Sequence, residues 1–92
     1  MEQNLDKLLD DTMESQGVMG VLCADKQGLC YSAKGTASAD SAGLVASLAH
    51  QASLLVPESP NAPVICLESD GGNVLVKSHQ DVTIAIHKMP GY

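Results

Sequence analysis

Apolar residues in the first part of the chain recur at helical spacing. Between residues 2 and 14 they form a single stripe, and acidic residues occupy much of the remaining surface. The stripe consists of Leu5, Leu8, Leu9, Thr12 and Met13. This spacing predicts an amphipathic helix over residues 2–14 that stops near Gly17, with Leu5, Leu8, Leu9 and Met13 packed inward.

The next apolar segment has the pattern of a buried strand. Residues 18–24 are almost continuously apolar, which is typical of a strand covered on both faces. Residues 25–28, Asp-Lys-Gln-Gly, then predict a tight hairpin loop in which Gly28 takes a positive φ. Residues 29–34 are the expected returning strand.

A second helix is predicted from about residue 40 to residue 56, with Ser38 as its N-cap. At about 100° per residue, its apolar side chains fall within an arc of about 140°. The arc contains Leu44, Val45, Leu48, Ala49, Ala52, Leu55 and Val56. It is wider than the roughly 100° that one packing surface requires. Two interpretations remain open: a broad core face, or a helix that serves both its own sheet and a partner.

Three strands are predicted after a proline-punctuated loop at residues 57–63. They span residues 64–68, 74–78 and 82–87, with turns at 69–73 and 79–81. In the second of these strands, Val74 and Val76 share one face, opposite Leu75 and Lys77. The last strand has the clearest alternation of the chain, with Val82, Ile84 and Ile86 on one face.

The element order therefore predicts an α/β protein of the α+β type. A helix, two strands, a helix and three strands form one domain over residues 1–92. Two hairpin-connected groups joined by a helical segment imply one mainly antiparallel sheet with helix cover.

Composition limits how much surface such a domain can bury. The chain has 92 residues, no Phe, no Trp and only two Tyr, so aliphatic and Met side chains must build the core. A domain of this size is marginally stable, and a partner can supply the missing burial.

Charge excludes several classes of function. The formal net charge is −6, from eleven acidic residues against five lysines and no arginine. Nucleic-acid binding needs a basic surface, and an anionic membrane repels such a chain. Without Arg, no arginine finger can act on a bound nucleotide. No apolar run approaches the roughly 18 residues of a membrane span, and no signal or lipidation motif is present. We expect a cytosolic chain with no direct membrane insertion and no nucleic-acid partner.

Candidate chemical groups do not form a recognisable site. Cys23, Cys30 and Cys66 are odd in number and form no C-x-x-C pair, which favours reduced thiols. Cys23 and Cys66 lie in apolar strands, where inert core thiols are expected, and Cys30 is expected to be exposed. His79 and His87 do not have metal-ligand spacing. Nucleophile-elbow and phosphate-loop motifs are absent. We therefore predict no catalytic residue, no cofactor and no metal.

Three segments resemble a known family. They are GVLCADKQGL at residues 20–29, CLESDGGN at residues 66–73 and IHKM at residues 86–89. These strings are similar to the family of the hepatitis B X-interacting protein, the small fifth, roadblock-type subunit of the Ragulator adaptor complex of late endosomes and lysosomes. The likeness extends from Leu5 to Met89.

The resemblance implies a roadblock/longin-like fold with sheet order 2-1-5-4-3. The chain reaches Tyr92 directly after the fifth strand, so the third helix of full-length roadblock proteins is expected to be absent. The family also implies a heterodimer with a second roadblock-type subunit, a lipidated wrapping subunit, other Ragulator subunits and Rag GTPases. The implied role is amino-acid signalling to the target-of-rapamycin kinase complex from the lysosomal surface. A stand-alone adaptor and a GTPase-regulating catalytic domain are the alternatives.

In the implied sheet order, the strand at residues 64–68 is an outer edge without Lys or internal Pro to block pairing. We expect this edge and the preceding helix to form the interface with the partner. The predicted interface residues are Leu44, Val45, Leu48, Ala49, Ala52, Val64, Ile65, Cys66, Leu67 and Glu68.

Overall fold

The computed structural model describes residues 2–92 and the side chains of these residues other than Glu2, Gln3 and His79. Its elements are α1 (Glu2–Met13), β1 (Val18–Asp25), β2 (Cys30–Gly35), a 3-10 turn (Ala39–Ser41), α2 (Ala42–Leu55), β3 (Ile65–Ser69), β4 (Gly72–His79) and β5 (Val82–Lys88). The predicted order of helices and strands is confirmed, and the predicted boundaries differ from the observed ones by at most two residues.

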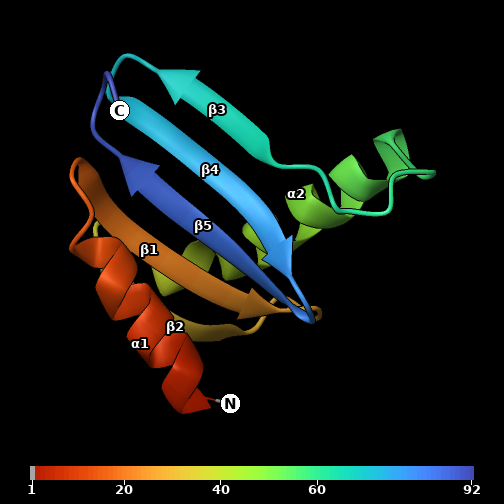
Figure 1. Ribbon diagram of the computed structural model, residues 1–92, viewed down its shortest axis with the longest axis horizontal. Helices are drawn as coiled ribbons and strands as arrows, with labels where there is room; N and C mark the ends of the chain where they lie inside the picture. The colour runs from red at the N-terminus through yellow and green to blue at the C-terminus, as the bar shows by residue number, and fades with distance from the viewer. Residues whose placement is uncertain (1) are drawn as a thin grey trace.

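The strands form one five-stranded sheet in the order β2-β1-β5-β4-β3. Each neighbouring pair is antiparallel, so the implied fold class and strand order are also confirmed. The last strand, β5, lies between β1 and β4 (Figure 1). This insertion leaves β2 and β3 as the two outer edges of the sheet.

The helix α2 covers one face of the sheet. Its side chains Ala42, Val45 and Ala49 are buried against small and medium residues of three strands. Those strand residues are Leu22 and Ala24 of β1, Val76 of β4 and Ala85 of β5. Since so many of these side chains are small, α2 lies close to the sheet but buries little area per residue.

The helix α1 covers part of the opposite face, in front of β1 and β2 (Figure 1). Leu9 is 1% exposed and packs with Val21, Cys23, Val82 and Ile84, while Leu5 and Met13 are partly buried at the rim of this cluster. Leu8, predicted to pack inward, is instead 40% exposed. Adjacent helical residues point about 100° apart, so the helix cannot bury Leu8 and Leu9 equally on one strand pair.

Turn residues place these elements as the sequence predicts. The Ser38 side chain accepts a hydrogen bond from the Asp40 backbone N–H at 3.2 Å and so caps the 3-10 turn that leads into α2. In the loop between β1 and β2, the Asp25 carboxylate accepts bonds from the Gln27 and Leu29 N–H groups, both at 2.9 Å. Gly28 in this loop has the predicted positive φ, 89°.

Gly17 follows α1 in a conformation that few other residues adopt. Its φ is +84°, and a Cβ added there would lie 2.3 Å from the Tyr92 ring. The Met89 N–H donates to the Gly17 carbonyl at 2.7 Å. Gly17 therefore both follows the predicted helix stop and lets the segment after β5 pack against it.

We predict that Leu9→Ala lowers the free energy of unfolding of the isolated chain by about 2–5 kcal/mol, because it leaves a cavity under α1. Leu8→Ala removes the same atoms from a partly exposed position and should cost about 1 kcal/mol or less. Urea unfolding followed by circular dichroism measures both. Equal losses for the two variants would contradict the orientation of α1.

Candidate protein interface

The strand β3 is the outer edge that the sequence analysis singled out. Its only strand neighbour is β4. Ile65 is half-buried, and every residue from Cys66 to Ser69 is exposed. Val64, expected to begin this strand, precedes it and is 61% exposed. The edge is therefore open along its whole length.

Hydrogen-bond alternation determines which backbone groups of β3 point outward. Ser69 and Gly72 flank a two-residue turn, and such flanking pairs face each other with their N–H and C=O groups. Counting back from Ser69, Leu67 and Ile65 direct these groups toward β4, whereas Cys66 and Glu68 direct them away from the sheet. His79 and Val82 flank the turn between β4 and β5 in the same way. The residues of β4 that stand opposite Ile65, Leu67 and Ser69 therefore direct their N–H and C=O groups toward β3.

The side chains of β3 divide between the two faces. Ile65 and Leu67 stand opposite Val76 and Val74, which belong to the face covered by α2. Cys66 stands opposite Leu75 and faces the α1 side with Glu68. A strand added to this edge would extend both faces of the sheet.

The exposed side of α2 differs from the predicted one. Val45 and Ala49, expected to contact a partner, are each 8% exposed and belong to the chain's own core, so their assignment to the interface is corrected. Leu48 and Ala52 are half-buried. Leu44 is 66% exposed, as an interface residue requires.

Many exposed large apolar side chains fall in the segment that runs from the end of α2 into β3. Among the described side chains, eleven large hydrophobic residues are exposed, and five of them lie between residues 54 and 67. The five are Leu54, Leu55, Val56, Val64 and Leu67, with Leu55 the most exposed at 83%. The first three were not among the predicted interface residues. Their position in the sequence could have identified them as exposed, because they lie at the end of a helix just before a proline-containing loop. The sheet no longer covers the chain at that point.

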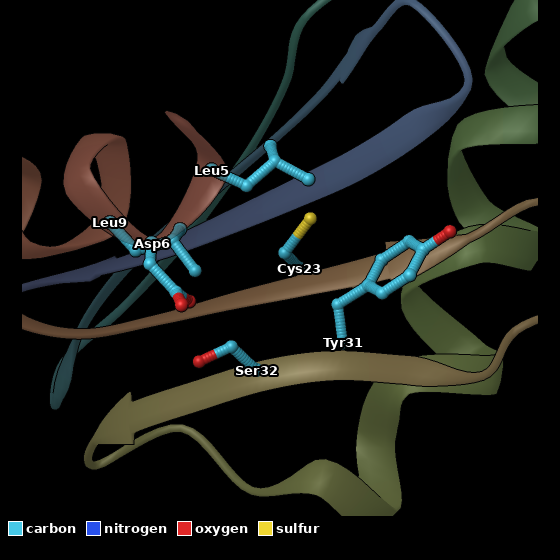
Figure 2. Close-up of a pocket in the computed structure, with 6 residues that line it drawn as sticks. All are labelled: Leu5, Asp6, Leu9, Cys23, Tyr31 and Ser32. Atoms are coloured by element: carbon cyan, nitrogen blue, oxygen red, sulfur yellow. The ribbon is translucent and has the colours of Figure 1, made fainter. Parts of the chain in front are cut away.

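A small cavity lies on the other side of the molecule, between α1 and the β1–β2 hairpin. Its volume is about 150 Å³. Figure 2 shows Leu5, Asp6 and Leu9 of α1 around it, with Cys23 of β1 and Tyr31 and Ser32 of β2. Burial raises the pKa of the Cys23 thiol, and the nearby Cys30 adds to the shift. The neutral thiol is a poor nucleophile, so this cavity lacks an activated group.

Two of the three cysteines differ from expectation in their exposure. Cys23 is buried, as predicted, but Cys66 is exposed and Cys30 is intermediate. Cys30 packs against the core under α2, whereas Cys66 lies on the open edge strand. The apolar neighbours of Cys66 in sequence predicted a core position because sequence alone does not show that β3 lacks a covering helix on that face.

A shallow groove beside α1 is the other apolar feature. Leu8 and Thr12 of α1 form one wall, and Lys77, Ile84 and Ile86 of β4 and β5 form the rest. Its volume is about 160 Å³. The groove exists because α1 lies over β1 and β2 and leaves the neighbouring strands of this face uncovered.

In the part of the chain that the structure describes, no three His, Cys, Asp or Glu side chains converge as metal ligands. His87 lies 3.2 Å from the Thr36 hydroxyl, measured from Nδ1 to Oγ1. Neither α1 nor α2 is long and apolar enough to cross a membrane.

Comparison with known proteins identifies the family. The family model described as Ragulator complex protein LAMTOR5 matches residues 1–88. The chain belongs to the LAMTOR5 family. A LAMTOR5 homolog of Nematostella vectensis is 53% identical over 90 residues, which cover 98% of this chain and 99% of the relative. LAMTOR5 of Xenopus laevis is 40% identical over 89 residues, which cover 97% and 98% of the two chains.

Solved structures that are similar to this chain show which fold it has. Myxococcus xanthus MglB has a TM-score of 0.80 at 15% identity, covering 97% of this chain and 72% of that one. A roadblock/LC7 domain from Streptomyces avermitilis has a TM-score of 0.74 at 17% identity, covering 94% and 78%. The chain thus has the roadblock/LC7 fold. Since LAMTOR5 proteins are non-catalytic Ragulator subunits, it is not an enzyme.

We predict that thiol reagents label the cysteines in the order Cys66, Cys30, Cys23, because exposure falls in that order. Mass spectrometry of the alkylated native chain at successive times measures this. The pKa of an ordinary thiol is about 8.5. Because burial raises the pKa of Cys23, this thiol should stay unlabelled even above that pH. Its thiol ionises first in the unfolded chain, so stability should fall as the pH rises through that range. Labelling of Cys23 before Cys30 in folded protein would contradict this order.

Proposed function

We propose that the chain is a scaffold subunit that heterodimerises with a second roadblock-type subunit of Ragulator through the outer edge of β3 and the exposed side of α2. The heterodimer helps to recruit Rag GTPases to the lysosomal or late endosomal surface, where they act in amino-acid activation of the target-of-rapamycin kinase complex. The single observation that carries the pairing is the open, apolar β3 edge in a chain of the LAMTOR5 family.

The contrast between the two sheet edges supports the choice of β3. The other edge strand, β2, contains Lys34, which forms an ion pair with Asp10, and its pairing with β1 is interrupted by an irregularity beside Cys23. Charges and irregularities of this kind discourage added strands. The strand β3 has neither Lys nor Pro, and its register with β4 is continuous from Ile65 to Ser69.

In this arrangement the partner strand bonds to the outward N–H and C=O groups of Cys66 and Glu68 and continues the sheet. Val64, Ile65 and Leu67 supply apolar contacts beside this ladder. The partner's second helix packs on Leu44 and Leu48, near Ala52, and the last turn of α2 adds Leu54 and Leu55 to the contact. Burial of these side chains provides most of the affinity, whereas the ladder sets the register.

The groove beside α1 suits another Ragulator subunit. Leu8, Ile84 and Ile86 are apolar and sit on the face opposite α2, so this groove stays open when the β3 edge is occupied. We assign it to a segment of the lipidated wrapping subunit. That subunit then supplies the membrane attachment that this chain does not provide itself.

We predict that Cys66→Pro abolishes heterodimer formation but leaves the free chain folded. Proline removes an outward N–H, the one kind of strand position where it is tolerated. The matched control Cys66→Ala keeps the N–H and should pair like the parent. Co-purification with the roadblock partner, with circular dichroism of the free chain, tests this. A folded Cys66→Pro variant that still pairs would exclude the proposed edge.

Proline at Ile65 is a weaker test of the same interface, because the Ile65 N–H faces β4 and its loss damages the chain's own sheet.

We predict that the chain purified natively from lysosomal membranes brings with it a second roadblock subunit, a lipidated subunit and Rag GTPases. Native mass spectrometry of the purified assembly measures its composition. Recovery of the chain alone, or with unrelated proteins only, would favour a stand-alone adaptor instead.

A further inference from the structure

The charged side chains of β3 and of the loops on either side of it are all acidic. Glu68 is exposed on β3, Asp70 lies in the turn that follows it, and Glu58 is exposed in the loop that precedes it. From residue 35 to residue 76 the sequence contains no Lys or Arg. The segment from Leu54 to Asp70 therefore carries carboxylates and no lysine, whereas Lys77 of β4 and Lys88 of β5 lie farther into the sheet.

These carboxylates are not neutralised within the chain. The ion pairs among the described side chains are Lys26 with Asp81 and Lys34 with Asp10, and neither involves Glu58, Glu68 or Asp70. Lys88 shares a row of the sheet with Glu68, across Asn73, but makes no ion pair with it. None of the three carboxylates has an ion-pair partner among the described side chains, so a bound partner can supply one.

Self-pairing through this edge would set acids against acids. A dimer of identical chains is two-fold symmetric, so the end of β3 in one copy lies beside the start of β3 in the other. Asp70 of each copy would then approach the loop that carries Glu58 of the other, and both Glu68 side chains would lie between them. Like charges placed opposite one another on a sheet are destabilising, and each free copy already carries −6.

We propose that the Glu58, Glu68 and Asp70 carboxylates select a partner whose edge strand and flanking loop carry Lys or Arg, and that they prevent self-pairing. The inference rests on the proposed pairing through β3 and adds the chemistry of the partner. Complementary charges at the rim accelerate encounter and set specificity, while the apolar centre supplies affinity.

A variant of the chain itself serves as a basic partner of known structure. The full chain with Glu58→Lys, Glu68→Lys and Asp70→Lys keeps the β3 backbone and the apolar centre but reverses the rim. Sedimentation velocity of an equimolar mixture with the parent, at about 20 mM and about 500 mM salt, is the measurement. We expect the mixture to dimerise at a concentration at least tenfold lower than either chain alone, and high salt to remove most of this difference.

The matched control carries Asp6→Lys, Asp11→Lys and Glu14→Lys, the same change in net charge at exposed positions of α1 and of the turn that follows it. Its mixture with the parent should not dimerise more readily than the parent alone. Equal association of the control, or no association of the rim variant, would overturn the charge rule.

Adding Cys66→Pro to the rim variant separates this rule from the pairing mode. Loss of the mixed dimer is expected. Mixed dimers that persist would contradict pairing through β3, and with it the proposed function. Circular dichroism and thermal unfolding of each variant confirm that the exposed substitutions leave the fold intact.

Discussion

The position of β5 between the two hairpins is the constraint on which the rest of the structure depends. It is the only strand that bonds to both β1 and β4, and it does so from Val82 to Lys88 on either side. The residues from Val82 to Ala85 are all buried, because this strand contributes side chains to the core cluster on each face of the sheet. Inserting the last strand in the middle forces β2 and β3 outward. Two edge strands are therefore a consequence of this topology, and the side chains determine which of the two edges can accept a partner strand.

The open surfaces follow from how few large side chains the chain has to cover a five-stranded sheet. Two helices share the two faces, and α1 lies over β1 and β2. Without Phe or Trp, the chain cannot extend either cluster sideways over the remaining strands. The uncovered area falls at Leu8 and Ile86 on one face and at Leu67 on the edge. Incomplete coverage at two separate places suits a subunit that contacts two different neighbours.

Periodicity predicts elements better than it predicts their surroundings. The alternation in β5 and the stripe in α1 follow from backbone geometry alone, so both elements were predictable from the residues. The strand order came from resemblance, since alternation does not state which strands are neighbours. Leu8, Val45 and Cys66 show the same limit: each has a correctly predicted element, but its exposure depends on which strands the facing element crosses. The apolar arc of α2 left two interpretations open in the sequence, and only burial in the structure assigns Val45 and Ala49 to the sheet and Leu44 to solvent.

Marginal burial and an open edge together couple the stability of this chain to its assembly. A partner that binds only the folded state, present at about 100 times its Kd, adds about 2.7 kcal/mol to the stability. That gain is comparable with the cost of truncating one buried leucine such as Leu9. The same open edge would make the free chain prone to pair with itself, and the acidic rim opposes this without closing the edge to a basic partner. In the proposed pairing, affinity and selectivity would therefore reside in different residues of one surface: the apolar side chains of α2 and β3 would favour pairing in general, and Glu58, Glu68 and Asp70 would restrict it to a partner of opposite charge.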